Sequence, residues 1–482
     1  MEMLRKLAIS LVALLALPGL VSAQKWQPLH NQPTFSSPGT LVLLGDGTVM
    51  VHDGCAADWW KLTPDKTGSY INGTWKKLAS LPSGYAPLYY SSAVLPDGRV
   101  MVEGGEYLGS GSNCNSVWTT KGAIYDPVKN KWTAVNPPDG WSSIGDAQSV
   151  ILDDGTYMQA NCCNTQQATL NPKTFAWTNI TNTGKVDRFD EEGWTLLPNG
   201  EVLTVDAEQA PNSEIYNPAT KKWTSAGSTI VRLEDPNTQE IGPMVLRPDG
   251  TVFATGANSS GAGHTAIYNT KTKKWAKGPD FTGALNCSDA PAALETNGNV
   301  LVMTSPGFGP PGAVFFEWNG KKLTKVPGPP NARNDASYVG HLLELPTGQL
   351  LFSDFGQDME VFTAKGTYKA AWQPTITSVP GTLTHGKTYV VKGTQFNGLS
   401  QGGAYGDDFQ DATNYALVRI TNNASKHVTY AKTHNPSTMA VATGSKPVST
   451  SFDVPAGIET GASSLVVVTN GIPSAAQAVT VN

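Results

Sequence analysis

The chain has 482 residues, with 49 Gly and 33 Pro, and only 15% of its positions are charged, against roughly 25% in an average soluble domain. A coiled coil would need more charge and fewer turn residues, and a disordered chain would not carry 13 Trp, 15 Tyr and 14 Phe. The net charge of −5 gives no basic surface for nucleic acid or an anionic membrane. A loop-rich β protein remains.

The N-terminus has the three parts of a secretory signal peptide. Arg5 and Lys6 precede an apolar run over residues 7–20, and Val21-Ser22-Ala23 supplies the small residues of a cleavage site. A membrane anchor is the alternative, but the run is too short, and no later segment approaches 18 consecutive apolar residues. We predict a signal peptide at 1–23 and a secreted or periplasmic protein with no membrane span after cleavage.

Residues 24–372 repeat one pattern, in which a tight turn containing glycine separates two apolar runs, as in SSAVLPDGRVMVEGG. Asp-Gly and Asn-Gly between two such runs are the strongest local signal for a β-hairpin, because the turn needs positive φ. The pattern occurs seven times, 45 to 57 residues apart, with turn glycines Gly47, Gly98, Gly155, Gly200, Gly250, Gly298 and Gly348.

Each hairpin is followed by a third strand and a fourth strand that often carries tryptophan, as in AIYDPVKNKW ending at Trp132. Four strands in about 50 residues are typical of a kelch-type β-propeller, and seven repeats predict seven blades. The tryptophans of the fourth strands are expected to pack between blades. The segment around Trp26 resembles a fourth strand whose first three strands are missing. The N-terminus is therefore expected to close the ring by pairing with the last repeat.

After Trp372 the pattern changes to short strands rich in Ser, Thr and Val with Gly-containing turns. Residues 373–482 therefore predict a separate β-sandwich, and they resemble an immunoglobulin-like IPT/TIG module. The expected fold is all-β: a seven-bladed kelch-type β-propeller over 24–372 followed by a C-terminal immunoglobulin-like β-sandwich.

The chain has five cysteines, Cys55, Cys114, Cys162, Cys163 and Cys287. Export predicts disulfide bonds, and the odd number leaves at least one thiol unpaired or paired between chains. Their spacing does not assign the pairs. For the adjacent Cys162 and Cys163 we favour one partner bonded elsewhere and one buried thiol over a bond between the two.

A kelch propeller followed by such a module resembles the galactose oxidase and glyoxal oxidase family of copper radical enzymes. The resemblance implies copper near the propeller axis, held by two Tyr and two His, with the propeller ligands nine or ten residues before a turn glycine. The resemblance places Tyr89 and Tyr338 at the positions of the family's catalytic and metal-binding tyrosines. It places Tyr107 near the position of the family's stacking aromatic residue. One His would come from the C-terminal module, where His427 is the better candidate and His434 the second.

The sequence departs from that family at two positions. Ser37-Pro38 stands where the family has the cysteine that is cross-linked to tyrosine, so no thioether to Tyr89 can form there. Val339 stands where a histidine should follow Tyr338. His341 lies two residues from Val339, on the same face of a strand, and is the expected substitute. Copper held by Tyr89, Tyr338, His341 and His427 is one prediction.

The same spacing selects acidic residues in the other repeats: Asp146, Glu191 and Asp289 lie nine residues before a turn glycine, with Glu192 and Glu240 beside that position. The sequence therefore predicts an acidic mouth at the axis. Such carboxylates can bind a hard cation such as Ca²⁺, act as an acid and base pair, or accept hydrogen bonds from sugar hydroxyls. Alternatively they bond to loop N–H groups or face water.

Several aromatic residues lie in predicted loops outside the blade-core positions, namely Trp59, Tyr107, Trp118 and Trp141. Aromatic rings next to carboxylates suit sugar binding, because a pyranose ring has an apolar face and a polar edge. Packing under the loops is the alternative for each ring. Among these we select Trp59, Tyr107 and Trp141 as candidate ligand-binding residues.

Three functions follow from these features. The preferred one is binding of a carbohydrate or other polyhydroxy ligand at the axial mouth, with divergent or lost copper chemistry. The second is a copper-dependent oxidase of alcohols or aldehydes that produces hydrogen peroxide with an altered ligand set. The third is a surface adhesion protein that binds a protein partner through the propeller rim or the IPT module.

Overall fold

The computed structural model describes residues 24–110, 113–406 and 411–482, so the predicted signal peptide lies outside the described residues. Within these ranges the regular structure consists of strands and three short 3₁₀ helices, η1 (Ala332–Asn334), η2 (Ser337–Val339) and η3 (Ala370–Trp372). The all-β prediction is confirmed. None of the described helices is long and apolar enough to span a membrane.

In the part of the chain that the structure describes, seven sheets each contain an antiparallel meander of four strands. The first three are β2 (Pro38–Leu43), β3 (Val49–Asp53), β4 (Trp59–Thr63), β5 (Thr74–Lys77); β7 (Ser91–Val94), β8 (Val100–Glu103), β11 (Gly122–Asp126), β12 (Lys131–Val135); and β13 (Ser149–Ile151), β14 (Tyr157–Ala160), β15 (Gln167–Asn171), β16 (Ala176–Ile180). The next two are β17 (Thr195–Leu196), β18 (Val202–Val205), β19 (Asn212–Asn217), β20 (Lys222–Ser228); and β21 (Met244–Leu246), β22 (Thr251–Thr255), β23 (Thr265–Asn269), β24 (Lys274–Lys277).

The last two meanders take additional strands from elsewhere. The sixth contains β26 (Ala292–Leu294), β27 (Val300–Pro306), β28 (Val314–Trp318) and β29 (Leu323–Val326), with β25 (Leu285–Asn286) paired to β27. The seventh contains β30 (His341–Glu344), β31 (Leu350–Ser353), β32 (Glu360–Thr363) and the N-terminal β1 (Lys25–Pro28). A small separate sheet contains β6 (Pro87–Leu88), β9 (Tyr107–Ser110) and β10 (Asn113–Ser116).

Among the first strands, β13 contacts β7 and β7 contacts β2, while β17, β21, β26, β30 and β2 contact one another in that order, so the sheets surround a common axis. Strand β1 pairs with β32 in antiparallel register, with Trp26 opposite Phe362. The N-terminus therefore completes the seventh sheet, as the sequence predicts. This pairing joins the first described strand of the chain to the last strand of the propeller.

The seven hairpin turns depend on glycine. All seven predicted turn glycines have φ between +73° and +86°, a conformation that is unfavourable for residues with a Cβ. Each turn closes with a backbone hydrogen bond of the kind that joins Gly47 N to the Leu44 carbonyl at 2.9 Å. The Asp-Gly and Asn-Gly signals in the sequence thus reflect a real backbone requirement.

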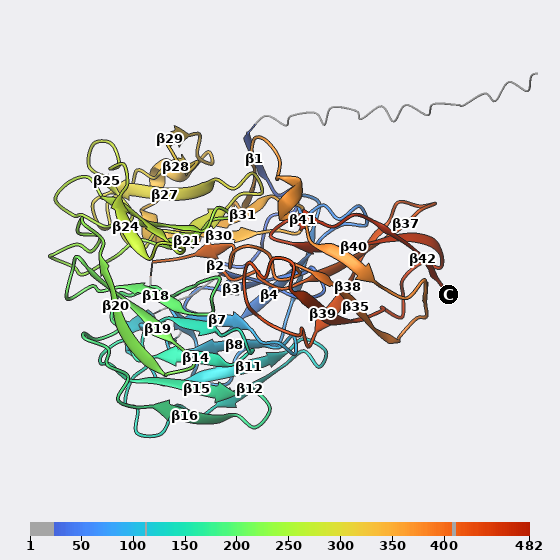
Figure 1. The fold of residues 1–482 in the computed structure, drawn as a ribbon, viewed down its shortest axis with the longest axis horizontal. Helices are drawn as coiled ribbons and strands as arrows, with labels where there is room; N and C mark the ends of the chain where they lie inside the picture. The colour runs from blue at the N-terminus through green and yellow to red at the C-terminus, as the bar shows by residue number, and fades with distance from the viewer. Residues whose placement is uncertain (1–23, 111–112, 407–410) are drawn as a thin grey trace, which may run out of the picture.

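The C-terminal strands form one nine-stranded sheet that packs around its own apolar core and lies to one side of the propeller (Figure 1). Its members are β33 (Thr375–Ser378), β34 (Thr382–Leu383), β35 (Thr388–Thr394), β37 (Leu417–Asn422), β38 (Val428–His434), β39 (Pro447–Asp453), β40 (Gly461–Thr469), β41 (Ile472–Pro473) and β42 (Gln477–Val481). The boundary at residue 372 and the IPT/TIG assignment stay predictions.

The C-terminal module packs on the hairpin end of the propeller. A Cβ placed on Gly47 would clash with Tyr430, and one on Gly155 would clash with Pro96 and lie close to Met439. Tyr430 and Met439 belong to hydrophobic clusters shared with propeller strands, and Val441 belongs to a third. The two parts of the chain therefore bury apolar surface against each other.

One strand of the C-terminal region leaves its module and joins the propeller. Strand β36 (Gly403–Ala404) pairs with the innermost strand β26, with Ala404 opposite Ala292. The neighbouring Gln401 side chain accepts a hydrogen bond of 2.8 Å from the Leu196 backbone N–H. The segment thus reaches from the hairpin end into the propeller axis.

The cysteine pairing differs from our expectation. Cys162 is bonded to Cys163, Cys55 is bonded to Cys114, and Cys287 is the buried free thiol. Spacing could not show this, because the pairing depends on which loops the sheets bring together. Both bonds are of the kind formed in oxidising compartments.

Lys185 lies at the centre of a fully buried acidic cluster near the fourth sheet. Its Nζ is 2.9 Å from Glu192 and 2.7 Å from Glu214, and it also bonds to Asp187. Burial alone would lower the pKa of Lys185, but Glu192 and its acidic neighbours reverse this and raise the pKa well above its usual range. The ammonium group therefore stays charged and supplies one positive charge to the cluster.

Replacing Lys185 with methionine should destabilise the fold by about 3–5 kcal/mol, because buried carboxylates would lose their partner. Since those carboxylates would then be protonated in the folded state, the loss should be larger at pH 8 than at pH 5. Urea unfolding of Lys185→Met against the exposed control Lys277→Met tests this. Equal stability of the two variants would contradict it.

Glu344 on β30 connects the propeller to the module. One of its oxygens accepts hydrogen bonds of 3.0 Å from Thr413 and 3.0 Å from Asn470, and the other is buried without a partner. Burial raises the pKa of Glu344 to about 7, with the two hydrogen bonds opposing that rise. The folded state therefore holds a proton here that the unfolded chain loses near its usual pKa of 4.5.

Because the folded pKa is raised, the contribution of Glu344 to stability is fully present below pH 4.5 and is lost as pH rises through 7. Glu344→Gln removes this titration. Between pH 5 and 7 the free energy of unfolding of the wild type should fall more steeply than that of the variant, by up to about 1.4 kcal/mol per pH unit. Denaturant titrations across this range measure both slopes, and parallel curves would refute the assignment.

Candidate functional site

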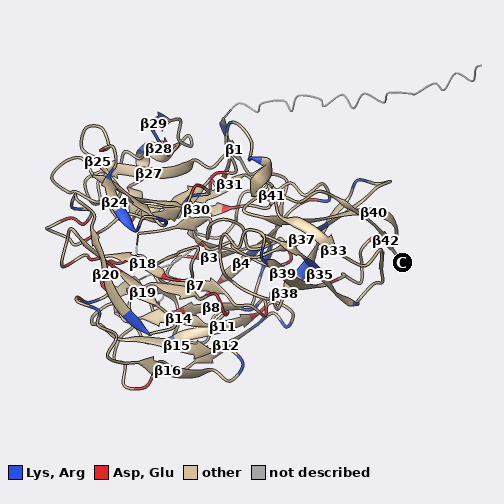
Figure 2. Cartoon of the chain, in the orientation of Figure 1, with Lys and Arg blue, Asp and Glu red and all other residues tan. Residues whose placement is uncertain are grey.

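A cavity of about 280 Å³ lies at the axis, at the end of the inner strands opposite the hairpin turns. Among the described residues, five aromatic side chains, five carboxylates and one glycine line it: Tyr89, Tyr107, Phe308, Tyr338, Tyr405, Glu106, Asp146, Glu191, Glu240, Asp289 and Gly309. None of these is basic. Lys and Arg appear instead on outer strands such as β20 and β24 (Figure 2).

Seven residues selected from the sequence line this one cavity: Tyr89, Tyr107, Asp146, Glu191, Glu240, Asp289 and Tyr338. They come together because equivalent positions of successive repeats occupy equivalent places around a propeller. Tyr89, Glu191 and Asp289 have φ values of 48°, 60° and 44°. Left-handed residues of this kind cost free energy and persist where the surrounding structure holds them, often at functional sites.

Tyr405, from the segment that carries β36, forms part of the aromatic wall. Its ring stacks on Tyr89 with centroids 6.2 Å apart and on His341 with centroids 5.7 Å apart. Its hydroxyl donates a hydrogen bond of 2.6 Å to the Tyr338 carbonyl. The C-terminal module thus supplies a wall of a cavity that otherwise belongs to the propeller.

Glu191, Glu240 and Asp289 form the tightest acidic group, with one ligand oxygen from each lying within 4.8 Å of the others. Glu240 hydrogen-bonds to both Glu191 and Asp289. Burial, followed by the charges of the neighbouring carboxylates, raises the pKa of Glu191 well above its usual range. Burial also raises the pKa of Asp289. Burial therefore disfavours the charged forms of Glu191 and Asp289 when no cation is bound.

Glu106 and Tyr107 follow Gly104-Gly105 and line the cavity side by side. Burial raises the pKa of Glu106 to about 7, opposed by a hydrogen bond to Tyr107. Burial, followed by the charge of Glu106, raises the pKa of Tyr107 to about 12. Tyr107 is therefore a neutral donor at physiological pH, and Glu106 titrates within the physiological range.

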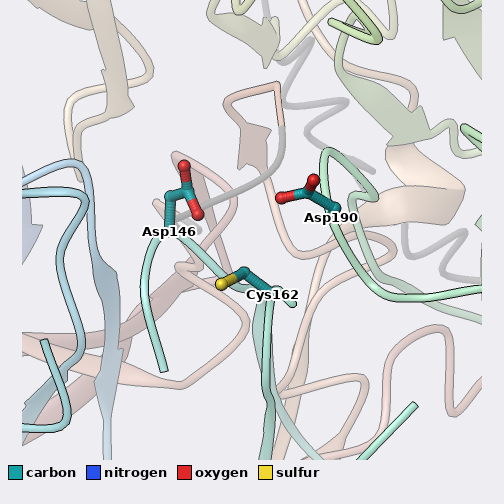
Figure 3. Close-up of side chains that lie close together, drawn as sticks. All are labelled: Asp146, Cys162 and Asp190. Atoms are coloured by element: carbon teal, nitrogen blue, oxygen red, sulfur yellow. The ribbon is translucent and has the colours of Figure 1, made fainter. Parts of the chain in front are cut away.

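A second acidic pair lies beside the cavity, where Asp146, Cys162 and Asp190 come within 4.8 Å of one another (Figure 3). Cys162 is bonded to Cys163 and offers no thiolate. Asp190 forms an ion pair of 3.0 Å with Arg188. This group is therefore not a thiolate metal site, and Asp146 belongs to the axial cavity that it lines.

The two predicted histidine ligands do not line the cavity. His341 is buried behind Tyr405, with Nδ1 3.1 Å from the Val339 carbonyl, and burial lowers its pKa to about 3. His427 lies on the C-terminal module and pairs with Glu459 at 2.5 Å. Strand alternation placed His341 near the axis but could not show that a ring from another module would cover it.

Two aromatic candidates also lie elsewhere. Trp59 is fully buried on β4, where it packs against His52 and Trp132 between the first two sheets. Trp141 is buried under its loop with Ile144. Neither ring lines the axial cavity, and both fill apolar space between or beneath the sheets.

Sequence reasoning missed four lining residues, Glu106, Phe308, Gly309 and Tyr405. Glu106 adjoins the selected Tyr107, so its position offered a signal. Phe308 and Tyr405 lie in segments without repeat periodicity, where spacing carries no information about the axis.

No family model matches the chain. Kelch-like protein terF of Aspergillus terreus is 32% identical over 137 residues, which cover 27% of this chain and 26% of that protein. A solved fungal alcohol oxidase of the AA5 family, in complex with copper, matches with a TM-score of 0.53 and 14% identity, covering 96% of this chain and 100% of that chain. The chain spans about a quarter of its curated relative, and the structural likeness shows the fold alone. The chain has a kelch-type, galactose-oxidase-like fold.

Proposed function

We propose that this protein acts outside the cytoplasm and binds a carbohydrate or similar small polyhydroxy ligand in the axial cavity. The observation that carries the proposal is the composition of the cavity wall, in which aromatic rings and carboxyl groups provide every lining side chain among the described residues. Aromatic faces pack on the apolar face of a sugar ring, while carboxyl groups accept hydrogen bonds from its hydroxyls.

Charge narrows the ligand class. An anionic sugar would meet five carboxyl groups and no basic lining residue among those described, so no lining side chain would pair with its charge. A neutral or amino-bearing sugar would meet carboxyl groups, phenol hydroxyls and aromatic rings. The volume of about 280 Å³ is close to the lower limit of ligand cavities and suits one sugar unit.

Two exposed aromatic rings beside the cavity support the same proposal. Among the described Phe, Trp and Tyr residues, only Trp118 and Phe308 are strongly exposed, at 54% and 41%. Phe308 lines the cavity and packs near Tyr338 with centroids 5.7 Å apart. Trp118 follows Val117, whose N–H bonds to the Glu106 carbonyl at 2.8 Å. Exposed rings beside a cavity are typical of ligand contact.

Phe308→Ala should weaken sugar binding about 3- to 10-fold, since stacking contributes about 0.5–1.5 kcal/mol beyond buried area. Neutral and amino sugars should bind, and uronic or sialic acids should not. Isothermal titration calorimetry with a panel of both classes measures this, with Val128→Ala, also exposed but outside the cavity, as the control. Preferential binding of acidic sugars, or equal affinity of wild type and Phe308→Ala, would contradict the proposal.

Copper-dependent oxidation of an alcohol is the second candidate, because Tyr89 and Tyr338 line the same cavity and the fold resembles a copper-bound alcohol oxidase. The described residues do not fit the expected ligand set, since neither His341 nor His427 lines the cavity. Cys287, the free thiol, is buried in the core that contains Phe253, and its Sγ donates a hydrogen bond of 3.6 Å to the Met303 carbonyl, so it is not placed to modify Tyr89. We derive no radical step from this arrangement.

Copper titration followed by electron paramagnetic resonance separates the two candidates. If the first proposal is right, the protein binds no stoichiometric copper that is lost on the substitution Tyr89→Phe. It also releases no hydrogen peroxide from galactose or glyoxal. Stoichiometric copper with peroxide release, both lost in Tyr89→Phe, would establish the oxidase instead. If neither sugar nor copper binds and a protein partner is recovered by affinity capture, adhesion becomes the better interpretation.

A further inference from the structure

The axial carboxylates have the spacing of a cation site. Glu191, Glu240 and Asp289 come from the loops that precede the first strands of the fourth, fifth and sixth sheets, and one oxygen from each lies within 4.8 Å of the others. A Ca²⁺ ion takes oxygen ligands at about 2.3–2.6 Å, so oxygens on opposite sides of it lie up to about 5 Å apart. The three oxygens can therefore surround one ion of that size.

A second observation points to a missing ligand. Asp146 lines the same cavity, is only 8% exposed, and its Oδ1 is buried without a hydrogen-bond partner. The Oδ1 of Asp289 is likewise buried without a partner. Buried carboxylate oxygens without partners are costly and rare in folded proteins, and a bound ion is one of the ordinary ways to satisfy them.

The acidic cluster around Lys185 is a comparable group of carboxylates in the same chain. Asp187, Glu192 and Asp206 also place ligand oxygens within 4.8 Å of one another, but there the Lys185 ammonium lies among them and supplies a positive charge. No described lysine or arginine lies within ion-pair distance of Asp146, Glu191 or Asp289. The positive charge that balances these carboxylates must come from protons or from an added cation.

We propose that Glu191, Glu240 and Asp289 bind a hard divalent cation, with Asp146 as a further oxygen ligand, and that Ca²⁺ is the appropriate probe. All four donors are carboxylate oxygens, which favour Ca²⁺, Mg²⁺ or Mn²⁺ over softer metals. Binding of this cation does not depend on the identity of the sugar.

The C-terminal segment closes one side of this site. A Cβ placed on Gly406 would lie 2.6 Å from Asp289 Oδ1, so the backbone there packs directly against the carboxylate. Glycine at 406 is therefore required by close approach to a proposed ligand. Gly406→Ala should weaken cation binding by displacing Asp289 while leaving its charge in place.

The full chain, stripped with EDTA and measured without sugar, should bind one Ca²⁺ in equilibrium dialysis. It should also give tyrosine-sensitised luminescence with Tb³⁺, because Tyr89, Tyr107, Tyr338 and Tyr405 line the cavity. Glu191→Gln combined with Asp289→Asn should reduce affinity by at least about tenfold and abolish the luminescence. The matched control, Glu201→Gln with Asp280→Asn, removes two carboxylates outside the cavity and should bind as the wild type.

Asp146→Asn is the second test if the double variant does not fold, and it should weaken Tb³⁺ binding with an unchanged circular dichroism spectrum. Absence of saturable Ca²⁺ binding, equal binding by the double variant and its control, or tight binding of Cu²⁺ without Ca²⁺ would each overturn the proposal. Because these measurements contain no sugar, their failure leaves the carbohydrate proposal standing, and failure of sugar binding leaves the cation site standing.

Discussion

The pairing of β36 with β26 is the interaction on which the axial site depends. The first strand of each meander faces the axis, where an unpaired edge would leave backbone groups without partners. A two-residue strand from the C-terminal module pairs with one of these edges. It brings Tyr405 between Tyr89 and His341 and sets Gly406 against Asp289. The propeller and the module therefore build the cavity jointly, and neither would form its walls alone.

The distribution of charge follows from the same architecture. In two clusters of this chain, carboxylates lie close together, and the clusters differ in the positive charge beside them. Around Lys185 the positive charge is part of the chain, which makes that cluster structural. At the axis the described lining supplies none, which makes that cluster able to accept a ligand. Burial makes the difference large, because an unneutralised carboxylate is costly away from water.

The fold of this chain resembles that of a copper-bound oxidase, but the residues at its axial site differ from the ligand set that the resemblance predicts. The propeller resembles a copper-bound alcohol oxidase in fold, and the two tyrosines that the sequence resemblance predicts as ligands, Tyr89 and Tyr338, line the axial cavity. The histidines do not follow: one is covered by Tyr405 and the other pairs with Glu459 on the module surface. A fold fixes where side chains can converge, whereas the chemistry depends on which side chains stand there.

The sequence alone determined the features that repeat. Turn glycines, alternating strands and the residues nine or ten positions before each turn recur in register, so Tyr89, Asp146, Glu191, Asp289 and Tyr338 could be assigned to one axis before any coordinates. Only the tertiary structure decided what lies outside the repeat: the partner of each cysteine, the burial of Trp59 and Trp141, the entry of Tyr405, and the position of His427. Local propensity sets turns and strands over a few residues, but contacts between distant loops depend on how all the sheets pack, and no spacing in the chain encodes them.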